Sequence, residues 1–358
     1  MSRDGRLALS RSSDNAAPMR STPTDLSVPE PLVVEHRMIR AVAVLLGAVF
    51  LVVSIARPAA AASVTNLAAS TTETAMTAWK AALLGIVEGV TEYLPISSTG
   101  HLLVTSDLLG LGTTEEDIAA ANTYAIAIQF GAILAVAGLF WKRFRDMLLG
   151  LVGRSPEGRH LLIVLVVAFA PAAVLGFLFD DLIEQKLFSA WPIIAAWFVG
   201  GLLILGLERA GKIPRRDSDA EPGRDRLLEI TVRQAFIIGL VQCLAMWPGT
   251  SRSLAAILGA LLVGVSMGAA VEFSFLLGFV TLTAASGYSL LSDGGALVEQ
   301  FGLVNPLIGL VFAFVSAVIA IKWMIGYLQT HSLAIFGWYR IVAAGLTAGL
   351  VISGALAA

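Results

Sequence analysis

The chain has 358 residues, of which 57% are hydrophobic and 14% are charged, and its formal net charge is -2 at pH 7. Soluble domains carry roughly 25% charged residues, so this composition excludes an ordinary soluble domain and indicates an integral membrane protein. The near-neutral charge gives no support for a nucleic-acid partner, and the single cysteine, Cys243, excludes an intrachain disulfide framework.

The N-terminal region precedes the membrane segments. Residues 1–37 are rich in Ser, Pro, Asp and Arg without an apolar period, which predicts a disordered extension; a true start at Met38 is the alternative. In residues 38–78, a short apolar stretch follows basic residues and precedes small ones, which is typical of a signal peptide. A short first transmembrane helix is the other interpretation.

Six apolar runs are long enough to cross a bilayer, which takes about 20 residues of helix. They cover residues 122–140, 161–179, 191–207, 270–291, 302–321 and 336–358. The sequence therefore predicts an all-α, polytopic membrane protein with about six full spans.

Two further regions, 79–111 and 229–265, are apolar but are interrupted by polar residues at 95–100 and 248–253. The pieces on either side of each interruption are too short to span comfortably. We expect each region to form a re-entrant helical hairpin that enters and leaves on one side. Irregular backbone at this depth is tolerated where protein buries it or where it lines a wet cavity.

Charges in the connecting segments orient the spans, because Lys and Arg accumulate on the cytoplasmic side. Residues 141–160 and 208–228 are rich in Lys and Arg. In contrast, residues 112–121 and 292–301 contain Asp and Glu but neither Lys nor Arg. The first two segments are therefore expected inside, and the other two outside.

This orientation divides the membrane region into two halves, 79–207 and 229–358, joined by the cytoplasmic loop 208–228. Each half consists of a hairpin followed by three spans, and the halves run in opposite directions. Such an inverted repeat is typical of transporters, whose broken helices meet near the membrane midplane. The two polar interruptions should therefore converge.

Glu88 and Glu92 are four residues apart and share one face of a helix. Two desolvated carboxylates repel each other unless a cation or a shared proton intervenes. The pair therefore indicates a site for Mg²⁺ or Ca²⁺, with water and substrate phosphate as the remaining ligands. The alternative is a buried pair that joins helices through hydrogen bonds.

The first interruption begins at Pro95, which ends the preceding helix. The polar residues that follow are Ser97, Ser98, Thr99, Gly100 and His101. We expect Gly100 to permit a turn and His101 to open the next helix, whose N-terminus would bind an anion. Alternatively, the hydroxyls only cap the helix and the histidine is structural.

The second interruption turns at Pro248-Gly249, and Thr250 and Ser251 cap the helix that follows. Arg252 stands at the start of that helix. A guanidinium at membrane depth requires a carboxylate or a phosphate. It could therefore bind a substrate phosphate, or form a salt bridge to one of the two glutamates without any substrate.

Together, these features predict a site for a polyanion, with a metal. The catalytic candidates are Glu88, Glu92, Ser98, His101 and Arg252. The substrate-binding candidates are Ser97, Thr99, Gly100, Gly249, Thr250, Ser251 and Ser253. Gln129 and Gln242 either contact this site or join helices, and Tyr339 and Arg340 are expected to be interfacial anchors.

The stretches "EGVTEYLPISSTGHL" and "PGTSRS" resemble the two signature regions of the bacterial undecaprenyl-diphosphatases, also called bacitracin-resistance proteins. The resemblance covers roughly residues 78–358. It implies hydrolysis of undecaprenyl diphosphate, which recycles the lipid carrier of peptidoglycan synthesis. It also implies a divalent cation, a polyprenyl diphosphate lipid as partner within the membrane lipids, and an inner-membrane site that opens toward the periplasm.

By motif position, the resemblance assigns function to Glu88, Glu92, Ser97, Ser98, His101, Ser251 and Arg252. After "PGTSRS" the family usually continues with Gly, another residue and Thr, where this chain has Leu254-Ala255-Ala256. The usual "FLLAIP" is "FLLGFV" at 275–280.

Several alternatives stay open at this point. The inverted repeat would also suit a flippase for an anionic polyprenyl phosphate, or an ion-coupled transporter of a small anion. In a hydrolase, the attacking group could be metal-bound water with Glu92 or His101 as base, or it could be Ser98 or His101 itself. The sequence leaves a homodimer open as well.

Overall fold

The computed structural model describes residues 76–111, 115–213 and 225–356, which contain helices and no strand. The prediction for residues 1–37, and nearly all of that for 38–78, lie outside this part. The helices of the first half are α2 (Ala78–Thr91), α3 (Ser98–Leu108), α4 (Glu115–Leu139), α5 (Trp141–Leu151), α6 (Pro156–Leu187) and α7 (Ala190–Arg209). Those of the second half are η1 (Arg226–Glu229), α8 (Val232–Gln242), η2 (Cys243–Met246), α9 (Arg252–Leu262), α10 (Met267–Phe301), α11 (Val304–Leu328) and α12 (Ala334–Ile352).

All six predicted spans are confirmed as helices long and apolar enough to cross a membrane. These spans are Asn122–Leu139, Pro156–Phe179, Ala190–Arg209, Met267–Ser289, Val304–Leu328 and Ala334–Ile352. The basic segment 141–160 was expected to be a loop, but most of it forms α5 and the start of α6. Met147 of α5 is buried whereas Lys142 and Arg145 are exposed, so this helix is amphipathic, and it packs against α6.

Both interrupted regions consist of two short helices joined by irregular backbone. In the first, α2 ends at Thr91 and α3 begins at Ser98, after Pro95. In the second, α8 is followed by the 3-10 turn η2, and α9 begins at Arg252. The predicted breaks are therefore present, while re-entry from one side of a membrane remains a prediction.

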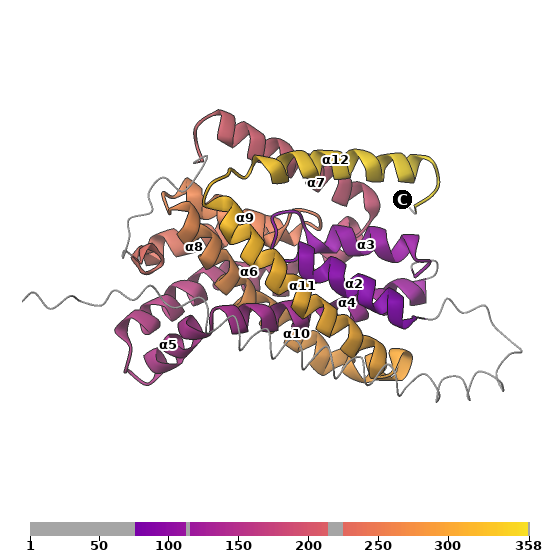
Figure 1. Cartoon of the computed structure of the whole chain (residues 1–358), viewed down its shortest axis with the longest axis horizontal. Coiled ribbons are helices and arrows are strands. Elements are labelled where there is room, and N and C mark those ends of the chain that lie inside the picture. Colours follow the sequence, from indigo (N-terminus) through magenta and orange to yellow (C-terminus); the bar gives the residue numbers. More distant parts are fainter. Residues whose placement is uncertain (1–75, 112–114, 214–224, 357–358) are drawn as a thin grey trace, which may run out of the picture. The chain divides into compact units, whose positions relative to one another are not determined.

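The helix contacts follow the order expected for a repeat. The broken helix α2 packs on α11, and its counterpart α8 packs on α6; α4 packs on α10, and α7 on α12. The last pair lies side by side at one edge of the bundle (Figure 1). Glycines permit the two equivalent close contacts, because a Cβ on Gly85 would meet the backbone of Gly309, and one on Gly239 the backbone of Ala168. Small residues at helix crossings are typical of membrane bundles.

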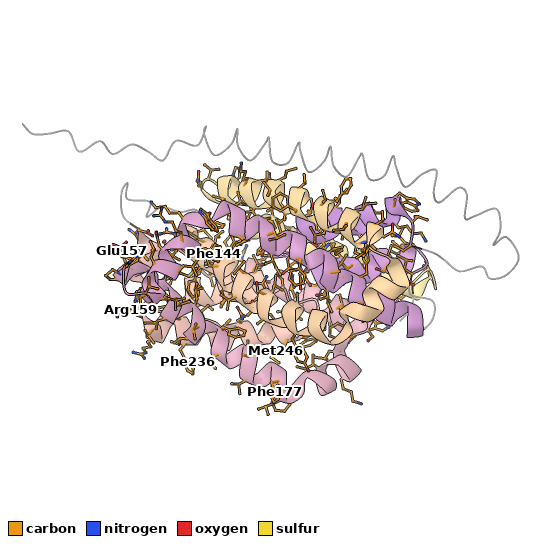
Figure 2. The ribbon with its side chains drawn as sticks, turned by 90° about the horizontal axis from the view of Figure 1, so that it is seen from below. Phe144, Glu157, Arg159, Phe177, Phe236 and Met246 are labelled. Atoms are coloured by element: carbon orange, nitrogen blue, oxygen red, sulfur yellow. The ribbon has the colours of Figure 1, made fainter. Side chains whose placement is uncertain are left out.

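The outer flank of the bundle carries large apolar side chains. Phe177 is 91% exposed and Phe236 is 49% exposed, and both project away from the helices (Figure 2). The charged residues Glu157 and Arg159 lie at one end instead (Figure 2). An extended apolar flank with charges at an end fits a lipid-facing surface.

One ion-pair cluster stands apart from the candidate residues. Arg143 Nε donates to Glu272 Oε1 of α10 at 2.8 Å, and its Nη1 donates to Asp225 Oδ2 at 2.5 Å. Although partial burial acts to lower the pKa of the Arg143 guanidinium, these two carboxylates raise it above its usual value. The cluster ties the start of α5 to α10 and to the segment before η1.

Candidate active site

The two interruptions meet, as the repeat predicted. Ser253 Oγ of the second interruption donates to the carbonyl oxygen of Leu94 in the first, at 3.0 Å, and Ser251 Oγ lies 3.4 Å from the same oxygen. The hydroxyls of Ser251 and Ser253 are 3.0 Å apart. Both serines are buried, so these hydrogen bonds hold the tips of the two hairpins together.

Glu92 is at the centre of the polar cluster. Arg252 Nη2 donates to Glu92 Oε1 at 2.7 Å, and Ser98 Oγ donates to Glu92 Oε2. Both side chains are largely buried, with 14% of Arg252 and 6% of Glu92 exposed. The Arg252 salt bridge foreseen as an alternative is therefore present, and the same carboxylate also binds the hydroxyl of a candidate nucleophile.

Arg252 is packed between the first interruption and α10. Its guanidinium carbon lies 5.9 Å from the centre of the Tyr93 ring, within the range of a cation–π contact. A Cβ on Gly278 would collide with the guanidinium. Gly278 is part of the departure "FLLGFV", so the arginine uses space that the family's usual alanine would fill.

Glu88 lies one turn before Glu92 and is 1% exposed. Within the described part of the chain, neither of its carboxylate oxygens makes a hydrogen bond of normal geometry, although the Gln129 side chain is near enough to donate weakly and Glu92 and Arg252 interact with the carboxylate electrostatically. The Oε1 of Gln129 accepts from Ser286 Oγ at 2.7 Å, which ties α4 to α10. A buried, unpartnered carboxylate is suited to bind a cation or a proton.

The described residues contain no group of three or more His, Cys, Asp and Glu side chains that could hold a metal. Glu88 and Glu92 would therefore supply two ligands, and water and substrate oxygens the others. This is the usual arrangement for Mg²⁺, which keeps several waters. The orphaned oxygens of Glu88 thus fit the predicted cation.

His101 has defined partners for both ring nitrogens. Nδ1 lies 2.6 Å from the Ser97 carbonyl oxygen and Nε2 lies 2.7 Å from the Tyr339 hydroxyl. Because a carbonyl only accepts, Nδ1 carries a hydrogen, and in neutral His101 the Nε2 lone pair accepts from Tyr339. The ring also packs against Trp197, with centroids 4.8 Å apart. Through Trp197 and Tyr339, His101 contacts α7 and α12 rather than Ser98 or the glutamates.

The start of α3 differs from the expectation. The helix begins at Ser98, not at His101, so Gly100 is a helical residue rather than a turn. Gly100 is needed for packing, since a Cβ there would collide with the Trp197 ring. Thr99 is exposed, and the structure gives it no contact with the polar cluster.

The start of α9 agrees with the expectation. Ser251 is the N-cap and accepts from the Leu254 N–H at 3.3 Å, and Arg252 is the first helical residue. Gly249 provides the turn, with a φ of 91°. Thr250 is half-buried beside this turn.

Arg340 is a central residue that the sequence interpretation missed. It was expected to be an interfacial anchor, but it is fully buried. Its Nη2 donates to the carbonyl oxygens of Ala196 and Gly249, each at 2.9 Å, and its Nη1 to that of Pro95 at 3.3 Å. The anchor prediction is wrong because three buried carbonyls accept from the guanidinium inside the protein, and two of them, those of Pro95 and Gly249, lie in the non-helical interruptions. The sequence did contain a signal for this burial, because an arginine within an apolar span needs polar partners inside the protein.

Comparison with known proteins completes this picture. The family model described as bacitracin resistance protein BacA matches residues 81–346, a range that contains every candidate residue. The chain belongs to this family. The resemblance drawn from the two signature stretches is thereby confirmed.

Individual relatives agree with this membership. A protein of Sorangium cellulosum called undecaprenyl-diphosphatase is 43% identical over 74% of this chain and 84% of its own length. Its namesake in Methylibium petroleiphilum is 43% identical over 75% of this chain and 93% of its own. Undecaprenyl-diphosphatase 2 of Rhodospirillum rubrum is 44% identical over 73% of this chain and 90% of its own length.

Proposed function

We propose that this chain hydrolyses undecaprenyl diphosphate to undecaprenyl phosphate and inorganic phosphate. The observation that carries the proposal is that Glu92 holds the Ser98 hydroxyl and the Arg252 guanidinium at the same time. In this proposal Ser98 is the nucleophile, Glu92 is its base, and Arg252 is the cation that would bind the phosphoryl oxygens. The names of the relatives supply the substrate.

The geometry favours Ser98 over the other attacking groups. Its oxygen would form a bond to the terminal phosphorus while its proton passes to Glu92. The bond from that phosphorus to the bridging oxygen then breaks, and the electron pair leaves with undecaprenyl phosphate. Water would next hydrolyse the phosphoserine, releasing phosphate and returning the proton to Ser98. Arg252 would stabilise the negative charge that develops on the phosphoryl oxygens.

The two hairpin tips would bind the diphosphate around this point. Free N–H groups at the starts of α3 and α9 favour anions, and Ser97 and Ser251 mark those starts. The polyprenyl tail would remain among the membrane lipids. From the family resemblance we infer a site that faces the periplasmic side of the inner membrane, while the charge asymmetry of the connecting segments orients only the spans. There the product would re-enter the lipid cycle of peptidoglycan synthesis, and this recycling accounts for bacitracin resistance.

A divalent cation is a further part of the proposal. Glu88 and Glu92 would hold it, because they are buried on one helix face and the Glu88 oxygens make no hydrogen bond of normal geometry. When bound, Mg²⁺ or Ca²⁺ supplies positive charge against the phosphoryl oxygens. Direct titration of purified protein with each cation tests this, and Glu88→Gln should weaken the binding.

Phosphate release by purified protein in detergent tests the function itself. Detergent micelles have no two sides, so lipid translocation cannot register, whereas hydrolysis of undecaprenyl diphosphate can. We expect stoichiometric release of phosphate and undecaprenyl phosphate. If no phosphate appears, but the protein moves the lipid between the leaflets of vesicles, the chain is the flippase instead.

A further inference from the structure

Tyr93, the residue after Glu92, has an unusual hydroxyl. The side chain is 0% exposed, yet within the described residues its hydroxyl has no hydrogen-bond partner. The other fully buried tyrosine, Tyr124, donates to the carbonyl oxygens of Asn305 at 3.0 Å and Ala81 at 3.3 Å. Burying an unsatisfied hydroxyl is unfavourable, and such violations are expected at functional sites.

The position of the ring is fixed by its neighbours. Phe275 of α10 packs edge-on, with ring centroids 5.5 Å apart and an interplanar angle of 88°. Arg252 lies over the ring at 5.9 Å, and the hydroxyl is close enough to Arg252, Glu92 and Glu88 for electrostatic interaction with each. The Tyr93 ring is therefore fixed beside the polar cluster.

A second unsatisfied donor belongs to Arg252, whose guanidinium lies over the Tyr93 ring. Nη1 of Arg252 also has no hydrogen-bond partner among the described residues, since only Nη2 reaches Glu92. Two unsatisfied donors on these neighbouring buried side chains are complementary to an anion with several acceptor oxygens. A phosphoryl group has three such oxygens, and hydrogen bonds to charged acceptors are among the strong ones.

We propose that the Tyr93 hydroxyl is a substrate-binding group that donates a hydrogen bond to a phosphoryl oxygen of the diphosphate. This inference rests on the proposed function. It adds Tyr93, which was not among the catalytic or substrate-binding candidates chosen from the sequence. It predicts that removing the hydroxyl makes the free protein more stable and the enzyme less active. The reason is that the buried hydroxyl lowers the stability of the free protein and has a hydrogen-bond partner only when substrate is bound.

Tyr93→Phe and Tyr124→Phe form a matched pair of variants, since each removes one buried hydroxyl without changing the ring. For Tyr93→Phe we expect an unchanged or higher Tm and a kcat/KM about tenfold lower, the effect of losing one hydrogen bond to a charged group. For Tyr124→Phe we expect a lower Tm and a kcat/KM like that of the wild type.

The increase in Tm produced by inorganic diphosphate provides a second readout, and it should be smaller for Tyr93→Phe than for the wild type. If Tyr93→Phe keeps both the wild-type kcat/KM and the full diphosphate shift, or loses as much Tm as Tyr124→Phe, the inference is wrong. If the wild type releases no phosphate, the proposed hydrolysis fails separately, and the diphosphate shift still decides whether Tyr93 binds the anion.

Discussion

Ser97 and Ser251, which precede the second helices of the two hairpins, share an unusual backbone conformation. Ser97 has φ 74° and ψ 107°, and Ser251 has φ 74° and ψ 115°. In the described part of the chain they are the two residues other than glycine with positive φ. A side chain in this region costs about 1–3 kcal/mol and is typical of functional sites. The shared conformation also relates the two halves as a repeat.

This strain leads to a first prediction about glycine substitutions. Ser97→Gly should leave Tm unchanged or raise it, because glycine tolerates positive φ and the Ser97 side chain makes no capping bond. Ser251→Gly should lower Tm, because the Ser251 hydroxyl caps α9 and bonds to Leu94 and Ser253. Thermal unfolding in detergent measures both changes, and equal shifts for the two variants would contradict the assignment.

The second prediction concerns Arg340, which joins Pro95, Ala196 and Gly249. Arg340→Met should destabilise the protein by about 3 kcal/mol or more, since it removes the donors to three buried carbonyls and two of these, on Pro95 and Gly249, lie outside the helices. Arg340→Lys should be intermediate, because an ammonium group can satisfy some of them. The order of Tm values should be wild type, Lys, then Met. A Tm for Arg340→Met equal to that of the wild type would show that the tips are held together by other contacts.

The third prediction separates the Tyr339 hydroxyl from its ring. Tyr339→Phe keeps the ring beside His101, where the centroids are 5.6 Å apart, but removes the hydrogen bond to Nε2. If this bond orients a histidine that acts in the reaction, kcat should fall about fivefold, the value of a typical hydrogen bond. Because Tyr339 is 43% exposed, Tm should change little. An unchanged kcat would leave His101 a structural role only.

The fourth prediction tests the inverted repeat. Cys243 is the sole cysteine, so its replacement by alanine gives a background for single cysteines at positions 152, 218 and 295. Val152 is 66% exposed at the end of α5. An impermeant reagent added to intact cells should label position 295 but not positions 152 and 218. Labelling of position 218 with protection of 295 would contradict the predicted orientation.

Much of the fold could be predicted because apolar length and proline have direct physical consequences. Length fixed the six spans, and Pro95 and Pro248 marked breaks that the structure contains. The pairing of Glu92 with Arg252 was foreseen as one of two options, since a buried guanidinium needs an anion.

Other features depend on tertiary contacts that no local pattern reports. In the sequence, Arg340 resembles an interfacial anchor. In the structure it donates to the carbonyl oxygens of Pro95 and Gly249, one in each interruption. The positive φ of Ser97 shifts the start of α3 and brings the His101 Nδ1 to its carbonyl oxygen. Similarly, α5 was missed because its charges resembled those of a loop, whereas its buried face packs on α6.

Arg252→Lys examines one member of the central cluster. The substitution keeps the positive charge but loses the planar guanidinium that binds Glu92 and, in the proposed mechanism, would bind phosphate. Turnover should fall about a hundredfold, comparable to the loss of one electrostatic stabiliser. Combined with Glu92→Gln, it should cost less than the sum of the two single effects, because groups that act on one transition state are not additive. Fully additive losses would mean that the two residues act independently.

The most direct test of the account is phosphate release by Glu92→Gln at saturating Mg²⁺. The variant keeps the size of the side chain but cannot accept the Ser98 proton as a carboxylate does, so turnover should fall about a hundredfold or more. Glu272→Gln is the matched control, because Glu272 also pairs with an arginine, Arg143, at 2.8 Å but is not a candidate site residue; it should retain wild-type turnover. Release by Glu92→Gln within a few-fold of the wild type would contradict the account and leave Glu92 a role in joining the hairpins.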